Sequence, residues 1–363
     1  MGEPALVGRE REYVLDCLDS TWISSVGGYI ERFEVEFARY CGVRHAVACI
    51  NGTAAIHLAL VALGLKPDDE VLVPALTFVA SANPVRYCGA QPVFVDSDPI
   101  NWTLDPRRLE SAITARTRGI VAVHLYGHPA DMDAVHTVAA RHGLWVLEDA
   151  AEAHGASYRG RPVGSLGTAS AFSFYGNKIL STGEGGMVAT DDAELAARVR
   201  LLRGQGQDPE RRYWFGVLGY NYRISNIAAA IGLAQLERAD WHTARRREIA
   251  AWYRDELADL EGLTLSPEAE WARSAHWMSC AVLDTDRFGG RDAAIVALAA
   301  DGIETRPFFH PLHTLPIYAE RHGGGALPVA EDLGRRGLNL PSSAMLSRDD
   351  VAYVAGRVRA LAR

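Results

Sequence analysis

Residues 119–149 read GIVAVHLYGHPADMDAVHTVAARHGLWVLED, and this stretch carries the plainest structural pattern in the chain. Two apolar runs, 119–125 and 144–149, are separated by a segment with helical periodicity. Asp131 can cap the start of that helix and Gly143 can close its end. The stretch therefore predicts a strand, a helix and a second strand, which is the βαβ unit of a parallel sheet.

The same alternation continues toward the N-terminus. Further short apolar runs precede helical segments, one of which is expected from Thr53 to Leu63 and another to end near Tyr87. The runs are AVACI (46–50), VLVP (71–74) and PVFVD (92–96). Together they predict an α/β fold with a largely parallel, buried sheet. In such sheets ligands bind beyond the carboxyl ends of the strands.

The second half of the chain changes character. Residues 155–190 are rich in Gly, Ser and Thr and predict short strands joined by tight loops. A helical pattern starts near Ser225, and its apolar stripe continues to Leu260. This length predicts one long helix that leads from a large domain into a smaller one.

The C-terminal part predicts the elements of that smaller α+β domain. They are a strand at SCAVL (279–283), a helix from about Asp292, and a final helix that opens with Ser347 and Asp350 in capping-box spacing. We expect a large domain over residues 1–240 and a small domain over residues 241–363.

Composition narrows the class of protein. The chain has 363 residues, of which 48% are hydrophobic and 23% charged, and this mixture excludes a disordered or fibrous chain. A net charge of −8 argues against a nucleic-acid partner. No signal peptide and no apolar run of membrane-helix length is evident. We therefore expect no membrane partner. The five cysteines form no CxxC pair, so we expect no metal site and a reducing, cytoplasmic location.

Lysine is scarce in this chain. Only Lys66 and Lys178 occur among 37 basic residues. Lys66 lies in GLKPDD, which is typical of an exposed turn, whereas Lys178 lies in AFSFYGNKILSTGEGGMV (171–188), between a short strand and three glycines. A lysine, unlike an arginine, can become a neutral amine and form a Schiff base. We therefore expect Lys178 to form a Schiff base.

Two further features fit a phosphate-bearing cofactor. The turn Asn51-Gly52-Thr53 joins a strand to a helix start, where backbone N–H groups bind anions, although a plain turn with a threonine cap has the same pattern. Asp149 ends a buried strand in LWVLEDAAEAHGA. It could hold magnesium, face the pyridine nitrogen of pyridoxal 5′-phosphate (PLP), or cap a helix. No GxxxxGK[ST] loop supports the first reading. His154 alone is typical of a packed, hydrogen-bonded histidine.

The chain resembles the sugar aminotransferases of the DegT/DnrJ/EryC1/StrS family nearly end to end. The resemblance rests on NGTAAIHLAL, EDAAEAHGA, FYGNKILSTGEGGM, LGYNYRISN and TRPFFHPLH. It implies the fold-type-I architecture of PLP-dependent transferases, with a large domain that resembles aspartate aminotransferase and a smaller C-terminal α+β domain. It also implies a homodimer with shared active sites.

The resemblance implies a role for each matching residue. Lys178 would form the Schiff base with PLP, and Asp149 would face the pyridine nitrogen. The remaining cofactor contacts would come from Gly52, Thr53, Phe78, Glu152, Ser173 and, across the dimer interface, Asn221. Arg306, His310 and His313 would contact the substrate. The chain departs from the family pattern at Glu152, where many members have Gln, and at His310, where an aromatic residue is expected.

The implied reaction moves the amino group of L-glutamate to a nucleotide-linked keto sugar. The motifs FYGNK and LGYNYR are most similar to the subgroup that aminates C4 of GDP-4-keto-6-deoxymannose to give GDP-perosamine. Amination of a 3-keto sugar, or of a dTDP- or UDP-linked sugar, is the main alternative. A PLP-dependent sugar dehydratase is disfavoured by Lys178, because the related dehydratases have histidine there. A PLP-binding regulator is disfavoured by the joint presence of Lys178, Asp149 and Ser173.

Overall fold

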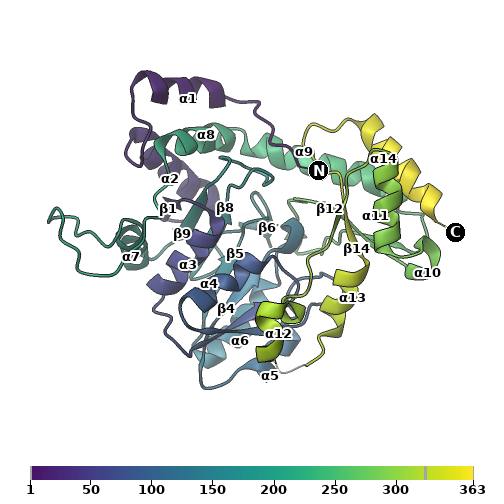
Figure 1. The fold of residues 1–363 in the computed structure, drawn as a ribbon, viewed down its shortest axis with the longest axis horizontal. Helices are drawn as coiled ribbons and strands as arrows, with labels where there is room; N and C mark the ends of the chain where they lie inside the picture. The colour runs from purple at the N-terminus through teal and green to yellow at the C-terminus, as the bar shows by residue number, and fades with distance from the viewer. Residues whose placement is uncertain (1, 323–324, 363) are drawn as a thin grey trace.

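The computed structural model describes residues 2–322 and 325–362 (Figure 1). Its main sheet has seven strands among the described residues. In this sheet only β9 is antiparallel to the strands beside it. The strand order is β1 (His45–Cys49), β9 (Gly186–Thr190), β8 (Ala169–Ser173), β5 (Trp145–Asp149), β4 (Thr117–Val123), β2 (Glu70–Pro74) and β3 (Gln91–Val95). The expectation of a mostly parallel α/β sheet is confirmed.

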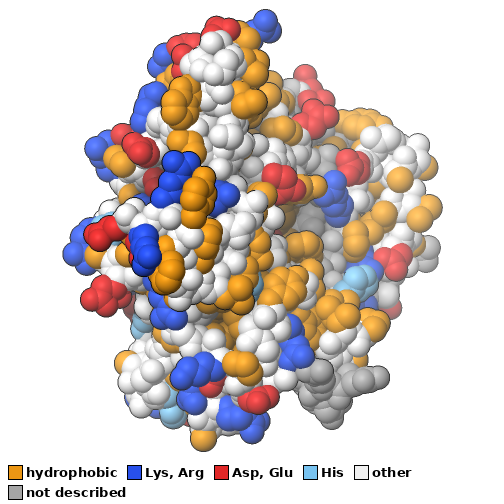
Figure 2. Space-filling model, turned by 60° about the vertical axis from the view of Figure 1, so that its left-hand side comes forward, with side chains coloured by type: hydrophobic (Ala, Val, Ile, Leu, Met, Phe, Trp, Pro, Cys, Tyr) orange, Lys and Arg blue, Asp and Glu red, His pale blue; other side chains and the backbone are white. Residues whose placement is uncertain are grey.

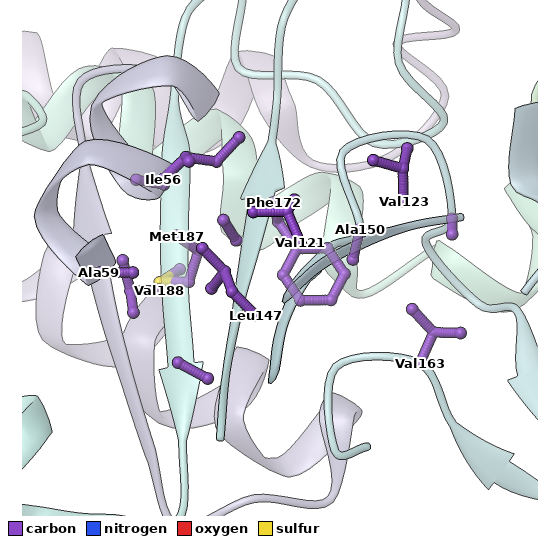
Figure 3. Close-up of a cluster of buried hydrophobic side chains, with 14 of the residues drawn as sticks. Ile56, Ala59, Val121, Val123, Leu147, Ala150, Val163, Phe172, Met187 and Val188 are labelled. Atoms are coloured by element: carbon purple, nitrogen blue, oxygen red, sulfur yellow. The ribbon is translucent and has the colours of Figure 1, made fainter. Parts of the chain in front are cut away.

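Helices cover this sheet and bury its strands. α3 (Gly52–Ala62) packs on β8 and β9, and in Figure 3 its Ile56 and Ala59 lie beside Met187 and Val188 of β9. The other helices of this part are α1 (Glu10–Asp19), α2 (Gly28–Cys41), α4 (Asn83–Tyr87), α5 (Leu109–Ala112), α6 (Met132–His142), α7 (Ala193–Arg203) and α8 (Asn226–Leu236). Burial on both faces explains why the strands read as continuous apolar runs.

Residues 119–149 fold as the sequence predicts. β4 leads into α6, and α6 leads into β5, which pairs in parallel with β4. The side chain of Asp131 accepts a hydrogen bond from the N–H of Ala134, and Gly143 ends the helix in the left-handed conformation with φ of 62°. Local capping and apolar periodicity were therefore sufficient to predict this unit.

A second, antiparallel sheet follows in the C-terminal part. Its strands are β10 (Leu263–Leu265), β12 (Ser279–Leu283), β14 (Gly337–Leu340) and β13 (Arg306–Pro307), in that order. The remaining helices are α9 (Ala239–Leu257), α10 (Thr285–Phe288), α11 (Arg291–Ala300), α12 (Pro316–His322), α13 (Pro328–Arg336) and α14 (Arg348–Leu361). Side chains of α9, α11 and α14 form a second apolar core with this sheet. The predicted strand at 279–283 and the Ser347–Asp350 capping box are both present.

The boundary expected at residue 241 stays a prediction. Several side chains beyond it, among them Phe308, Leu312 and Tyr318, belong to the core of the main sheet. A third, small sheet of β11 (Ala272–Arg273), β6 (Ser157–Tyr158) and β7 (Arg161–Pro162) also joins the two parts of the chain.

The expectation of one long helix from Ser225 to Leu260 is wrong. The helix is interrupted between α8 and α9, and Arg238 has a non-helical φ of −114° and ψ of 14°. Side chains at the break bind the N-terminal segment instead: Gln235 donates to the carbonyl of Ala5 and to Glu10, and Glu237 accepts from Tyr13. The apolar stripe runs across the break, so periodicity could not reveal it.

No helix among the described residues is long and apolar enough to cross a membrane. Within the same residues, no cluster of three or more His, Cys, Asp or Glu side chains is arranged to hold a metal ion.

Candidate functional site

A cavity of about 470 Å³ opens at the carboxyl ends of the parallel strands. The loops that follow β1, β2, β4, β5 and β8 form most of its wall, and the second sheet closes the other side. The residues that line it include Gly52, Thr53, Thr77, Phe78, Tyr126, Asp149, Glu152, Ser173, Asn177, Lys178, Trp277, Arg306 and Phe309. Charged, polar and aromatic residues from both sheets therefore line a single cavity.

The start of α3 forms the anion-binding end of this cavity. Asn51 caps the helix, and its side-chain oxygen accepts from the N–H of Ala54 at 2.8 Å. No carbonyl of the helix can reach the N–H groups of its first turn, so those of Gly52 and Thr53 remain for an anion. The alternative of a threonine cap is wrong, because Asn51 fills that position.

Gly52 is required by a close approach of α3 to β8. A Cβ atom at Gly52 would lie 2.6 Å from Cβ of Ser173, well inside contact distance. Ser173 ends β8 and is buried, with its hydroxyl accepting from the N–H of Tyr175 at 3.3 Å. Helix N–H groups and a serine hydroxyl therefore lie side by side at one end of the cavity.

Asp149 is the last residue of β5 and is held rigidly. Its carboxylate accepts a hydrogen bond from the Ser81 hydroxyl at 2.6 Å and another from the N–H of Ala151 at 3.2 Å. Ser81 is itself 2.9 Å from the hydroxyl of Thr77. No α-helix begins at Asp149, so the reading of Asp149 as a helix cap is wrong. Ser81 and Thr77 were missed by sequence reasoning, because neither stands in a recognisable motif.

Lys178 and Glu152 form an ion pair in the cavity. Nζ of Lys178 lies 3.6 Å from Oε1 of Glu152, and the lysine side chain is 11% exposed. Burial lowers the pKa of Lys178 and raises the pKa of Glu152 to about 7, even though Glu152 also accepts from the N–H of Tyr126 at 2.7 Å. Burial thus favours the neutral form of each group, and the carboxyl of Glu152 is partly protonated near neutral pH.

Aromatic rings line the remaining wall. Tyr126, in a left-handed conformation with φ of 53°, is stacked on Phe309 with centroids 5.4 Å apart and lies nearly parallel to Trp277 at 6.3 Å. Phe78 contacts Phe309 at 5.7 Å and is half exposed at the mouth. Tyr126 and Trp277 were not identified from the sequence, and no signal in a single sequence marks them.

Three predicted site residues do not line the cavity. Asn221 is exposed and pairs with Gly204 in an isolated bridge. His310 is exposed, and His313 is buried with Nε2 3.0 Å from a carboxylate oxygen of Glu331. Of the residues predicted to contact the substrate, the structure brings only Arg306 to this cavity.

His154 lies behind the cavity and is packed rather than hydrogen-bonded. Its ring contacts Phe37, Phe172 and Phe174, and neither ring nitrogen has a hydrogen-bond partner among the described residues. Burial lowers the pKa of His154 to about 3. The expectation of a packed histidine holds, and that of a hydrogen-bonded one is wrong.

The residues present fit PLP. Because Gly52 has no Cβ, the start of α3 lies directly beside Ser173, so that anion-binding N–H groups and a hydroxyl share one end of the cavity, which the buried carboxylate of Asp149 and the amine of Lys178 also line. These are the three groups that a PLP enzyme needs: an anion cradle, a partner for the ring nitrogen and a lysine.

Comparisons with known proteins agree with this geometry. A family model described as the DegT/DnrJ/EryC1/StrS aminotransferase family matches residues 4–359. The chain is 56% identical to a GDP-perosamine synthase of Caulobacter vibrioides and 48% identical to one of Escherichia coli O157:H7, each over 97% of this chain and 95% of the relative. It is also similar to the crystal structure of DesV from S. venezuelae in complex with a ketimine intermediate, with a TM-score of 0.92 and 41% identity over 97% of this chain and 94% of that one.

Proposed function

Since this chain belongs to the DegT/DnrJ/EryC1/StrS aminotransferase family, we propose that it transfers the amino group of L-glutamate to C4 of GDP-4-keto-6-deoxymannose. The products are GDP-perosamine and 2-oxoglutarate. The choice of sugar is supported by the two relatives named GDP-perosamine synthase, which match nearly the whole chain. The observation that supports this chemistry is the buried amine of Lys178. It lies 3.6 Å from the carboxylate of Glu152, in the cavity that Asp149 also lines.

The cofactor of this family is PLP, which supplies an electron sink for the carbanion formed at the donor's Cα. The N–H groups of Gly52 and Thr53 and the hydroxyl of Ser173 would bind its phosphate. The negative charge of Asp149 would keep the ring nitrogen protonated. Hydrogen bonds from Ser81 and Ala151 hold that carboxylate in place. Phe78 would cover the ring at the mouth of the cavity.

Lys178 has two tasks in this proposal: it binds the cofactor covalently and it moves protons. As a neutral amine it accepts a proton from Cα of the donor, and as an ammonium it returns one in the reverse direction. Burial favours the neutral form, whereas Glu152 stabilises the charged form. These two effects oppose each other, which suits a group that acts alternately as base and acid.

Substrate contacts are expected on the side of the second sheet. Arg306 is exposed at the cavity and can pair with the diphosphate of a nucleotide sugar. Roles for His310 and His313 remain predictions, since neither lines the cavity in the single chain.

We propose a homodimer in which Asn221 reaches the cofactor phosphate of the partner subunit. The loop of residues 207–218 projects from the molecule beyond α7 and exposes several large apolar side chains, among them Tyr213, Trp214, Phe215 and Leu218 (Figure 1). In Figure 2 hydrophobic side chains and Lys or Arg side chains lie next to one another on the face that comes forward. Such an exposed apolar surface is typical of a subunit interface. The cytoplasm is the proposed location of this dimer.

The experiment that tests the proposal is a direct comparison of acceptors. Purified protein, PLP and L-glutamate are incubated with the GDP-, dTDP- and UDP-linked 4-keto-6-deoxy sugars and with a 3-keto isomer, and the products are identified by NMR. We expect an amine at C4 of the GDP sugar, with the Lys178→Ala variant as the inactive control. Preferential amination of another nucleotide sugar, or of C3, would replace the proposed substrate but not the proposed chemistry.

A further inference from the structure

Trp277 contacts the amine that performs the proposed chemistry. Nζ of Lys178 lies 3.8 Å from the centroid of the indole ring. The indole N–H donates to the carbonyl of Asn177, the residue before the lysine, at 2.8 Å. Trp277 is only 5% exposed, so this contact is shielded from water. The ring thus holds both the side chain of Lys178 and the backbone beside it.

The backbone that carries Trp277 is held by two consecutive arginines of α9. Arg246, fully buried, donates to the carbonyl of Trp277 at 3.0 Å and to that of Ser342. Arg247 donates to the carbonyl of Ser274 at 2.6 Å and pairs with Glu268.

The turn before Trp277 is strained and tightly packed. His276 has a backbone φ of 47°, which residues other than glycine rarely adopt. Its Nε2 lies 3.6 Å from a carboxylate oxygen of Glu268. Gly127, beside Tyr126, allows the turn to approach, because a Cβ there would lie 2.8 Å from the backbone nitrogens of His276 and Trp277. A strained residue persists only where its surroundings hold it. Arg246 and Arg247, together with Glu268 and Gly127, provide that support, which fixes the position of the indole ring.

A π face attracts a cation but not a neutral amine. We propose that Trp277 is a positioning residue for Lys178: its indole face, fixed by Arg246 and Asn177, holds the ammonium form of the lysine beside Glu152 whenever the amine is free. The charged and titratable groups that influence Lys178 are Glu152, Asp149 and His154. Trp277 adds to the stabilising effect of the two carboxylates and opposes the effect of burial. This inference deepens the proposed function, on which the catalytic role of Lys178 rests.

The scarcity of lysine allows a direct test that does not depend on catalysis. Trace acetic anhydride is applied to the full-length protein from about pH 6 to 11, and mass spectrometry follows the acetylation of Lys178 and Lys66 separately. The measurement is made without cofactor and again after glutamate has converted the bound cofactor to its aminated form, which leaves Lys178 free. Lys66, in its loop, is the internal reference.

We expect Trp277→Leu to lower the pKa of Lys178 by about 0.5 to 1 unit, the size of a partly desolvated cation–π contact. Trp277→Phe keeps a smaller ring and should give a shift in the same direction of about half that size. Trp271→Leu removes another partly buried indole, which packs on Tyr158 and His128 away from the cavity, and should leave Lys178 unchanged. In the active enzyme, the acid limb of kcat should move to lower pH by the same amount, with little change in KM for glutamate.

Two results would overturn the proposal. One is a pKa of Lys178 that is the same in Trp277→Leu as in the wild type; if that variant does not fold, an unshifted Trp277→Phe has the same meaning. The other is an equal shift in Trp271→Leu, which would indicate a general loosening of the fold. Neither result would alter the acceptor assay, so failure of this inference and failure of the proposed function are distinguishable.

Discussion

At the scale of single residues, the chemistry depends on one amine. Lys178→Arg keeps the positive charge, but a guanidinium neither bonds covalently to the cofactor nor gives up a proton near neutral pH. We expect turnover to fall by at least about 10²- to 10⁴-fold, the contribution of general acid–base catalysis alone. Steady-state rates with glutamate and the keto sugar measure this. Lys66→Arg is the matched control, and near-normal turnover in Lys178→Arg would contradict the assignment.

Asp149→Asn tests the carboxylate independently of cofactor binding. The variant keeps Gly52, Thr53, Ser173 and Lys178, so cofactor content should remain close to that of the wild type. The negative charge is lost, and removing one partner of a buried ion pair costs about 3–5 kcal/mol, or roughly 10²-fold or more in rate. Single-turnover bleaching of the yellow protein by glutamate provides the measurement. Bleaching at the wild-type rate would show that another group faces the ring nitrogen.

The buried ring of His154 makes stability depend on pH. Its pKa is lowered to about 3 in the folded chain, whereas an unfolded histidine titrates near 6.5. The stability that the neutral ring contributes is present above pH 6.5 and is lost as the pH falls toward 3. We expect His154→Leu to lack this loss, which amounts to about 1.4 kcal/mol per pH unit. Urea unfolding at several pH values tests this; parallel pH profiles for the variant and the wild type would refute it, and His310→Leu, at an exposed position, is the control.

At the scale of elements, the contact between α3 and β8 sets the anion site. In Gly52→Ala the new methyl group would meet Cβ of Ser173 at 2.6 Å, so the helix start must move away from the strand. Overpacking of this kind costs about 1–3 kcal/mol of free energy. We therefore expect the dissociation constant for PLP to rise about tenfold or more. Equilibrium dialysis measures it. Gly28→Ala, at the start of α2 with nothing within 4 Å, should bind PLP normally; equal affinities in all three proteins would contradict this account of the cradle.

At the scale of the whole molecule, the isolated chain leaves Asn221 outside the cavity. If Asn221 acts on the partner's site, an inactive Lys178→Ala protein mixed with an inactive Asn221→Ala protein should regain activity. Random exchange of subunits puts both intact groups into one site of each mixed dimer, so recovery should approach about a quarter of the wild-type activity. Native mass spectrometry confirms the exchange. Exchange without recovery would place Asn221 in its own subunit's site or in none.

The sequence alone determined what depends on neighbours along the chain. Apolar periodicity and capping residues predicted β4, α6, β5 and the capping box of α14, because these signals act within one turn or one strand. The parallel sheet then predicted a ligand site beyond the carboxyl ends of its strands, one of which ends at Asp149, whereas the role of Ser173 came from the family resemblance. Lys178 was identified from its scarcity and its glycine-rich loop.

Only the tertiary structure decided which distant residues support that site. Ser81 binds Asp149 across 68 positions of the chain, and Trp277 binds Asn177 across 100. The break between α8 and α9 depends in the same way on contacts with the N-terminal segment. A hydrogen bond of this kind requires only a donor on one segment and a side-chain or backbone acceptor on the other, so it imposes no local pattern on either segment. Spatial proximity therefore had to be observed before Trp277 could be assigned its place against Lys178.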